Sequence, residues 1–329
     1  AASDVYKRQI WGFAQMRTSL SAIISRHVGS HQLRRINSLI PQALLLTITT
    51  GLILSLLLGF YYQKIVFLFF GKTDPLTYEY SNQYFIIRSY GIPLGLIIAL
   101  FFGIFRGFQN TYWAMYISII GGISNILLDY LLVLGVNEII MPMGVKGAAY
   151  ASVISQIIMT FSCIFIYLQK TPFNFQIKLN VSPFFKEMLF IFINMFIRTM
   201  VLNLVFIISN RFANSYGNNS LAAYTIGYNI WIFSAFFIDG YSNAGNALAG
   251  KYIGQKNNLK LKILGFNLLK INIKIAIILM TIYILLYPFI GQFFNSNKIV
   301  IEVFQSFFWM VILAQPFNAI AFTLSLIHI

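Results

Sequence analysis

The chain has 329 residues, of which 58% are hydrophobic and only 9% are charged, and its formal net charge is +15. Its mean hydropathy is +0.76. A water-soluble domain of this length could not bury so much apolar surface, so the composition excludes that class and indicates a chain that lies in lipid.

Nine apolar runs follow one another along the chain, each near the ~20 residues with which a helix crosses the hydrocarbon layer. Their ranges are 10–27, 38–60, 80–105, 111–134, 147–168, 189–212, 221–248, 266–290 and 303–327. These runs are apolar on all sides, as over 44–58, whereas the strands of a membrane barrel alternate apolar and polar side chains. We therefore predict an all-α, polytopic membrane helical bundle.

The loops between these runs alternate in charge. One set carries eleven cations: Arg26, Arg34, Arg35, Arg106, Lys170, Lys178, Lys186, Lys251, Lys256, Lys260 and Lys262. The other set carries four: Lys64, Lys72, Lys146 and Lys298. Because cytoplasmic loops are the basic ones, the first set is predicted to face the cytoplasm. The positive charge then reflects topology, and no nucleic-acid partner is expected.

Cysteine usage and the first residues say little about function. Cys163 is the single cysteine, so this chain offers no disulfide or thiolate metal site, and we expect Cys163 to pack between helices. Residues 1–9 contain no initiating Met, and we expect them to be non-native or disordered.

An internal repeat relates the two halves of the chain. Ala22–Gly29 recurs 225 residues later as Ala247–Gly254, and both segments close an apolar run with a basic residue and a glycine. Pro93 and Pro316 recur at 223 residues, and we expect both to bend their helices. Such repeats are typical of secondary transporters, whose halves move about a site between them.

The repeat also predicts how the chain is divided. Subtracting its length from the run at 189–212 places the mate of that run before residue 1, and the second half stops 13 residues after its proline. We expect a full protein with twelve spans, of which this chain carries the second to the tenth. The expected parts are a first lobe at 10–168, a cytoplasmic linker at 169–188 and a truncated second lobe at 189–329. Six spans per lobe give both lobes one orientation, related by a pseudo-twofold along the membrane normal.

Three motifs in fixed order resemble the multidrug and toxic compound extrusion (MATE) family. They are Arg106-Gly-Phe-Gln-Asn110, Asn125-Ile-Leu-Leu-Asp129 and Gly144-Val-Lys-Gly-Ala-Ala-Tyr-Ala-Ser-Val-Ile-Ser-Gln156. In the second half, Arg198-Thr-Met and the stretch from Asp239 to Gly250 resemble the DNA-damage-inducible F (DinF) branch. The resemblance implies a monomeric multi-pass exporter of small amphipathic organic compounds in a bacterial inner membrane. It would work by alternating access, with H⁺ or Na⁺ as coupling ion and no other cofactor.

Charged residues inside spans are costly and therefore mark candidate functional sites. Asp129 follows Asn125 by one helical turn, so the two side chains share a face that can offer oxygens to a cation. The resemblance implies that Asn125, Asp129 and Ser152 belong to a first-lobe cation or proton site, whose remaining carboxylate would precede residue 1. The structural alternative is an ion pair between Asp129 and Arg88, and both interpretations hold if they apply to different states.

Three further charges remain. Arg198 and Asp239 fall at similar depths of neighbouring runs and are predicted to pair, either as a structural latch or as a second-lobe coupling group. Arg17 lies in the first run, and we expect its partner in a helix that precedes the chain.

Aromatic residues of the second lobe supply a candidate substrate cavity. Tyr224, Tyr228, Trp231 and Tyr241 can stack on flat cationic ligands, although packing against lipid or other helices is the simpler explanation. His27 and His31 are expected to be solvated loop residues and not metal ligands. Gly-x-x-x-Gly spacings, as at Gly103 and Gly107, predict close helix approach.

Other functions are less compatible with these residues. A flippase for lipid-linked saccharides would share the architecture but needs a more cationic cavity than Arg17, Arg88 and Arg198 provide. A membrane-embedded transferase needs clustered acids or a histidine with an acid inside a span, and neither pattern occurs. We therefore expect a transporter and not an enzyme.

Overall fold

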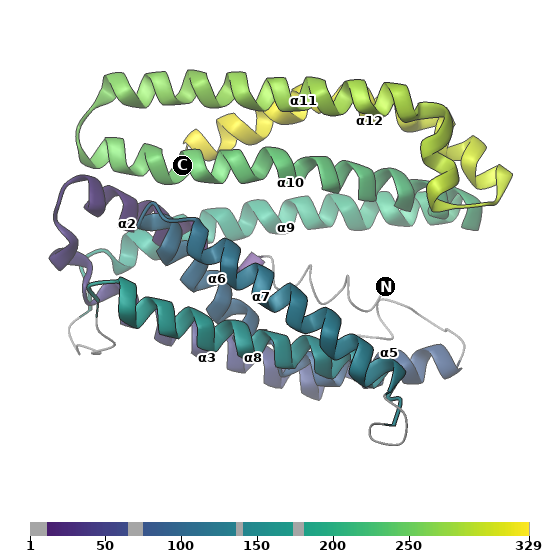
Figure 1. Cartoon of the computed structure of the whole chain (residues 1–329), viewed down its shortest axis with the longest axis horizontal. Coiled ribbons are helices and arrows are strands. Elements are labelled where there is room, and N and C mark those ends of the chain that lie inside the picture. The colour runs from purple at the N-terminus through teal and green to yellow at the C-terminus, as the bar shows by residue number, and fades with distance from the viewer. Residues whose placement is uncertain (1–11, 65–74, 136–140, 174–180, 329) are drawn as a thin grey trace. The chain divides into compact units, whose positions relative to one another are not determined.

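The computed structural model describes residues 12–64, 75–135, 141–173 and 181–328, and every regular element in these residues is helical (Figure 1). The elements are α2 (Met16–Gly29), η1 (Leu33–Ile36), α3 (Leu39–Phe60), α5 (Pro75–Ser89), α6 (Ile92–Gly107), α7 (Tyr112–Asp129), η2 (Tyr130–Leu134), α8 (Val145–Lys170), α9 (Phe185–Ser215), α10 (Asn218–Gly254), α11 (Asn258–Phe294) and α12 (Lys298–His328). The predicted all-α class is confirmed.

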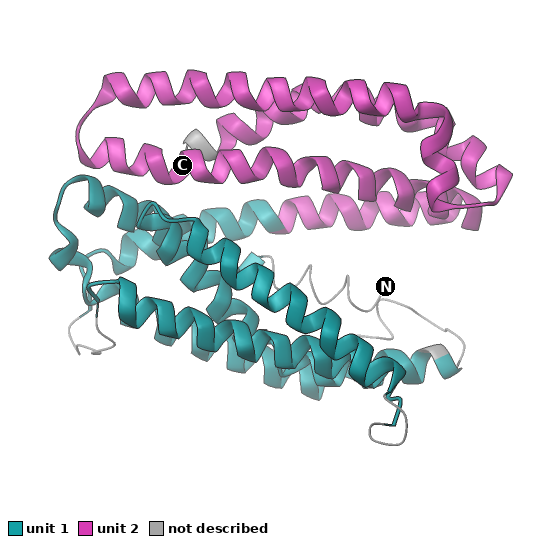
Figure 2. Ribbon diagram, viewed as in Figure 1, with its two compact units in different colours: residues 1–199 teal, residues 200–329 magenta. Residues whose placement is uncertain are grey.

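The chain forms two compact units, residues 1–199 and 200–329, and the division falls within α9 (Figure 2). The sequence placed the start of the second lobe at residue 189. The helix that follows the predicted linker therefore contributes its first half to one unit and its second half to the other.

Seven of the described helices are long and apolar enough to cross a membrane, and an eighth span results if α5 and α6 count as one bent helix. The run predicted at 10–27 is the 14-residue α2, and residues 10 and 11 lie outside the described part. By contrast, α10 and α11 have 37 residues each. At 1.5 Å per residue they are ~55 Å long and exceed the ~30 Å hydrocarbon layer.

The first unit is built on the close approach of α2 and α6. A Cβ atom added at Gly103 would lie 2.7 Å from the Arg17 Cα atom and 2.9 Å from its carbonyl carbon, and one added at Gly107 would meet Ile24. The Gly103/Gly107 prediction is thereby confirmed. Fully buried Leu20, Phe101 and other residues of both helices form the core beside this contact, where Cys163 is also buried as predicted.

The bend between α5 and α6 measures 50° and lies at Pro93, as the sequence predicted. Pro93 occupies the first turn of α6, where its missing N–H removes no helical hydrogen bond. Gly51 of α3 makes room for the ring, because a Cβ there would be 2.8 Å from the Pro93 Cα atom. The repeat-related Pro316 lies inside the continuous α12.

The second unit joins α10, α11 and α12 through a buried polar contact. Asn272 of α11 is fully buried, and its Nδ2 donates to Ser242 Oγ of α10 at 2.9 Å and to Thr323 Oγ1 of α12 at 2.6 Å. Nearby, Gly245 lies against Leu268, which brings α10 close to α11. Inside lipid, a side-chain amide stabilises helix association only when such partners are available.

One turn recurs three times and explains part of the sequence repeat. His31, Gln109 and Lys256 have φ of 56°, 63° and 54°, and they are the non-glycine residues with positive φ in the described part of the chain. Each follows a Gly-x pair and precedes Gln or Asn. The backbone hydrogen bonds are equivalent: Ser30 N to Arg26 O, His31 N to Val28 O and Gln32 N to His27 O; Phe108 N to Ile104 O, Gln109 N to Arg106 O and Asn110 N to Phe105 O; Gln255 N to Lys251 O, Lys256 N to Ile253 O and Asn257 N to Tyr252 O.

These turns end α2, α6 and α10. Asn110 and Asn257 then accept hydrogen bonds from backbone N–H groups of α7 and α11, so each turn stops one helix and caps the next. The segments at 26–32 and 251–257 thus repeat in backbone geometry as well as in sequence.

Gly103 offers a test of the α2–α6 contact. Gly103→Ala should lower the free energy of unfolding by about 1–3 kcal/mol, since the new methyl group meets backbone atoms that cannot move aside. Gly122→Ala is the matched control, because a Cβ there would meet nothing within 4 Å. Thermal unfolding followed by fluorescence-detected chromatography would show this difference, and equal midpoints for the two variants would contradict it.

Candidate functional site

The candidate coupling site lies on α7, one turn before its end. Asn125 and Asp129 are both partly buried, and α7 continues without a break past them into η2. Asn125 Nδ2 and Asp129 Oδ1 are buried atoms that have no hydrogen-bond partner among the described residues. Because a buried polar atom without a partner is costly, this pair is a place where a cation or proton would lower the free energy.

Ser152 reaches the same depth from α8. Gly121 of α7 lies directly against Met159 of α8, which fixes where the two antiparallel helices meet. From that contact, Asp129 is eight residues along α7 and Ser152 is seven residues along α8, about 12 Å and 10 Å at 1.5 Å per residue. Ser152 also shares the face of Met159, since seven residues make nearly two turns. The geometry is compatible with the three predicted residues acting together.

A local change of helix type follows Asp129 directly. Tyr130–Leu134 is a π-helical segment, and Met143 N donates to the Leu132 carbonyl oxygen at 2.9 Å. Gly147 of α8 packs against the same carbonyl group. Such π-helical insertions occur frequently at functional sites. The sequence gave no sign of this segment, because its residues are ordinary apolar helix formers.

Arg88 lies in another environment from the one that the ion-pair alternative supposes. Its side chain is only 7% exposed, and Nη1 donates to Gln156 Oε1 of α8 at 3.4 Å. The described residues contain no ion pair between Arg88 and Asp129. Gln156, which the sequence analysis did not select, therefore connects α5 to α8 at this point. Arg17 of α2 is half-buried where α6 approaches it.

In the second unit, three of the four predicted aromatic residues form one row on α10. The ring centroids of Tyr224 and Tyr228 are 6.2 Å apart, and those of Tyr228 and Trp231 are 6.4 Å apart. Phe206 of α9 lies edge-on to Tyr228 and Trp231 at 5.1 and 5.6 Å, and Phe322 of α12 approaches Trp231 to 6.4 Å. We call Tyr224, Tyr228 and Trp231 the aromatic row.

Tyr241 does not belong to this row. It is 50% exposed, and its position along α10 is rotated by about 100° from Tyr224 at 100° per residue. Helical spacing alone separates it from the other three.

Asp239 shares the face of the aromatic row. It follows Tyr228 by eleven residues, almost three full turns, so the two positions differ by about 20° around α10. Within residues 200–328 its carboxylate has no hydrogen-bond or ion-pair partner, while its carbonyl oxygen accepts from Asn243 Nδ2 at 2.8 Å. Arg198 belongs to the other unit, so the Arg198–Asp239 pair stays a prediction.

A model of the MatE family matches residues 9–131 and 195–328 of this chain. Protein DETOXIFICATION 42 of Arabidopsis thaliana is 27% identical over 253 residues, which make up 76% of this chain and 47% of that protein. DNA damage-inducible protein F of Escherichia coli (strain K12) is 22% identical over 250 residues, 75% of this chain and 53% of that protein. The chain thus spans about half the length of the curated relatives it matches. A solved crystal structure of MATE in complex with MaD3S has a TM-score of 0.85 at 20% identity, covering 98% of this chain and 72% of that one, which shows a shared fold.

Proposed function

We propose, because the chain belongs to the MATE family, that the whole protein is a secondary exporter of amphipathic organic compounds. Influx of H⁺ or Na⁺ would drive it, and its cycle would expose one cavity alternately to each side of the membrane. The multi-pass chain would reside in a bacterial cytoplasmic membrane and act as a transporter, not an enzyme.

One observation carries this proposal: Asp129 has a buried oxygen without a partner, one turn from Asn125 and level with Ser152. A carboxylate in such surroundings changes its charge state at low cost by taking up a proton or a sodium ion. Binding from one side and release to the other would then couple ion movement to export. The π-helical segment beside Asp129 supplies a place where α7 can change its helical winding.

We further propose that the chain stands near the DinF branch. Arg198-Thr-Met and the stretch from Asp239 to Gly250 support this assignment, and the Escherichia coli protein matches over 75% of the chain. The plant relative, at 27% identity, gives equal support to a wider group that includes both.

The aromatic row with Asp239 is our proposed substrate face. Flat cationic compounds stack on aromatic rings and are attracted to them and to a nearby carboxylate. This face carries an acid and no base, which favours an organic cation over the pyrophosphate of a lipid-linked saccharide.

Asp129→Asn in the full-length protein tests the coupling site. The amide keeps the shape but cannot take up a proton or balance a cation, so gradient-driven efflux should fall by about tenfold or more. Dye efflux from vesicles under an imposed pH or sodium gradient measures this. Glu79→Gln is the control, because Glu79 is exposed on α5 and bonded only to Gln83 in the described residues. Undiminished, gradient-dependent export by Asp129→Asn would remove Asp129 from the mechanism.

Trp231→Ala and Tyr228→Ala test the substrate face. Each should weaken binding of a flat cationic dye by about 3- to 30-fold, the range expected for one ring-to-cation contact. Tyr241→Ala on the other face of α10 should change binding by less than about twofold. Fluorescence anisotropy of the dye with solubilised full-length protein gives these dissociation constants. Equal effects at Tyr241 and Trp231 would show that the row is a packing feature.

A further inference from the structure

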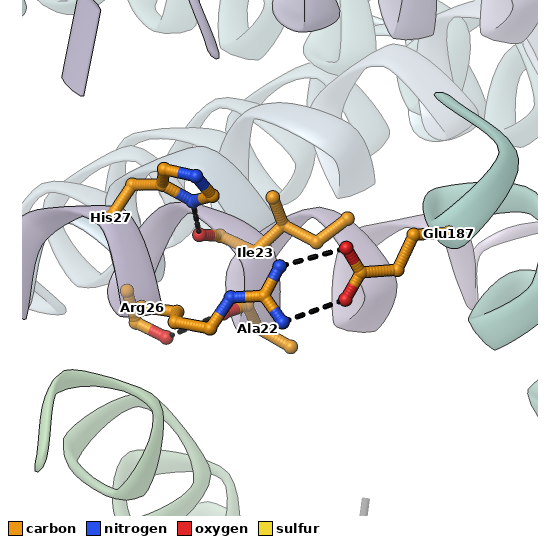
Figure 3. A network of polar contacts seen from close by, with 6 residues as sticks. Ala22, Ile23, Arg26, His27 and Glu187 are labelled. Atoms are coloured by element: carbon orange, nitrogen blue, oxygen red, sulfur yellow. Dashed lines mark hydrogen bonds and ion pairs between the residues drawn. The ribbon is translucent and has the colours of Figure 1, made fainter. Parts of the chain in front are cut away.

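The first turn of α9 is held on the first unit by a two-pronged ion pair. Arg26, at the end of α2, donates through Nη1 and Nη2 to Oε1 and Oε2 of Glu187 at 2.7 and 2.8 Å (Figure 3). Each side chain is 36% exposed. Both charges also suit their helices, since a cation is favoured at the end of α2 and an anion in the first turn of α9.

His27 adds an aromatic contact next to this pair. Its Nδ1 lies 2.9 Å from the Ile23 carbonyl oxygen, and its ring meets Phe184 edge-on with centroids 4.5 Å apart. The sequence predicted a solvated loop residue, and that prediction is wrong: α2 continues to Gly29, and His27 is only 5% exposed. Phe184, which is distant in sequence, provides the cover.

The residues just before α9 are tied down as well. Ser182 N donates to Gln42 Oε1 of α3 at 3.0 Å, and the Ser182 carbonyl oxygen accepts from Phe185 N at 3.0 Å. Met188 is fully buried in the core of the first unit, and Phe173 is 2% exposed there. The segment from Ser182 to Met188 is thus attached by an ion pair, a backbone hydrogen bond and buried apolar side chains.

The rest of α9 within the first unit is far more exposed. Phe190, Ile193 and Ile197 are 69%, 51% and 54% exposed. Half-exposed ion pairs exchange partners readily, because water compensates the separated charges. Withdrawing Met188 and its apolar neighbours into water is much less favourable, so the buried contacts make this attachment durable.

We propose that residues 182–188 form a permanent anchor, which keeps the inner end of α9 on the first unit through the whole transport cycle. The bending that transport requires then occurs in α9 beyond Met188. Thr199, where the first unit ends, suits such bending, since its Oγ1 donates back to the Met195 carbonyl oxygen at 2.8 Å. The alternative is a gate, in which these contacts break and reform in each cycle.

Cross-linking in the full-length protein distinguishes the anchor from a gate, and this test rests on the proposed transport function. Arg26→Cys and Glu187→Cys would be combined after every native cysteine, including Cys163, is replaced. A bifunctional thiol reagent that is cleaved by reduction joins the pair, and dye efflux is measured before cross-linking, after it and after reduction. The single-cysteine variants, treated identically, control for modification alone. We expect efflux within about twofold of the untreated protein, because a contact that never opens can be locked without loss.

Efflux that is lost on cross-linking and restored by reduction would overturn the anchor. If the Arg26/Glu187 variant does not fold, Gln42→Cys with Ser182→Cys places the cross-link across the neighbouring hydrogen bond and has the same two outcomes. A protein without any gradient-driven efflux before cross-linking would instead contradict the transport function, so the two failures are distinct.

Thiol labelling gives a measure that does not depend on efflux. Met188→Cys should react with a water-soluble maleimide at least about tenfold more slowly than Lys186→Cys, which is exposed two residues earlier, with and without dye and ion gradients. Labelling of Met188→Cys that accelerates to the rate of Lys186→Cys during transport would establish a gate.

Discussion

Every polar group inside a lipid bilayer needs a partner within the protein, and this constraint organises the structure. Backbone groups meet it by forming helices, which is why the described elements are all helical. Buried side chains meet it mostly in pairs, as Asn272 does with Ser242 and Thr323, and as Arg88 does with Gln156. The Asn125–Asp129 pair is an exception, and the proposed ion coupling depends on it.

The two units use the same local devices for different ends. Equivalent turns at His31 and Lys256 end α2 and α10, which supports a duplication behind the sequence repeat. In the first unit, glycines of α6 bring it against α2, whereas in the second unit α10 supplies the glycine that receives Leu268. Polar side chains diverge as well: the first unit carries Asp129, and the second carries an aromatic row with a carboxylate on one face.

Much of the fold could be predicted from the sequence, because apolar length and polar breaks mark the spans directly. The run at 111–134 became α7 with η2, and the run at 147–168 became α8. The ends of α10 and α11 were underestimated, since their polar residues next to the basic loop are helical too. The site was predicted less completely. Spacing placed Asn125 and Asp129 on one face and could have excluded Tyr241, but no local pattern reveals the partner of Arg88, the cover over His27 or the π-helical segment, which depend on contacts distant in sequence.

Flux driven by an ion gradient is the most direct measurement of what this protein does. The full-length protein would be reconstituted in vesicles loaded with a fluorescent organic cation, with a pH or sodium gradient imposed separately across the membrane. Dye should leave the compartment that the ion enters, at a rate that rises with the gradient and vanishes when it is collapsed. Dye movement that ignores both gradients, or stops at equal concentrations on both sides, would contradict an ion-coupled exporter.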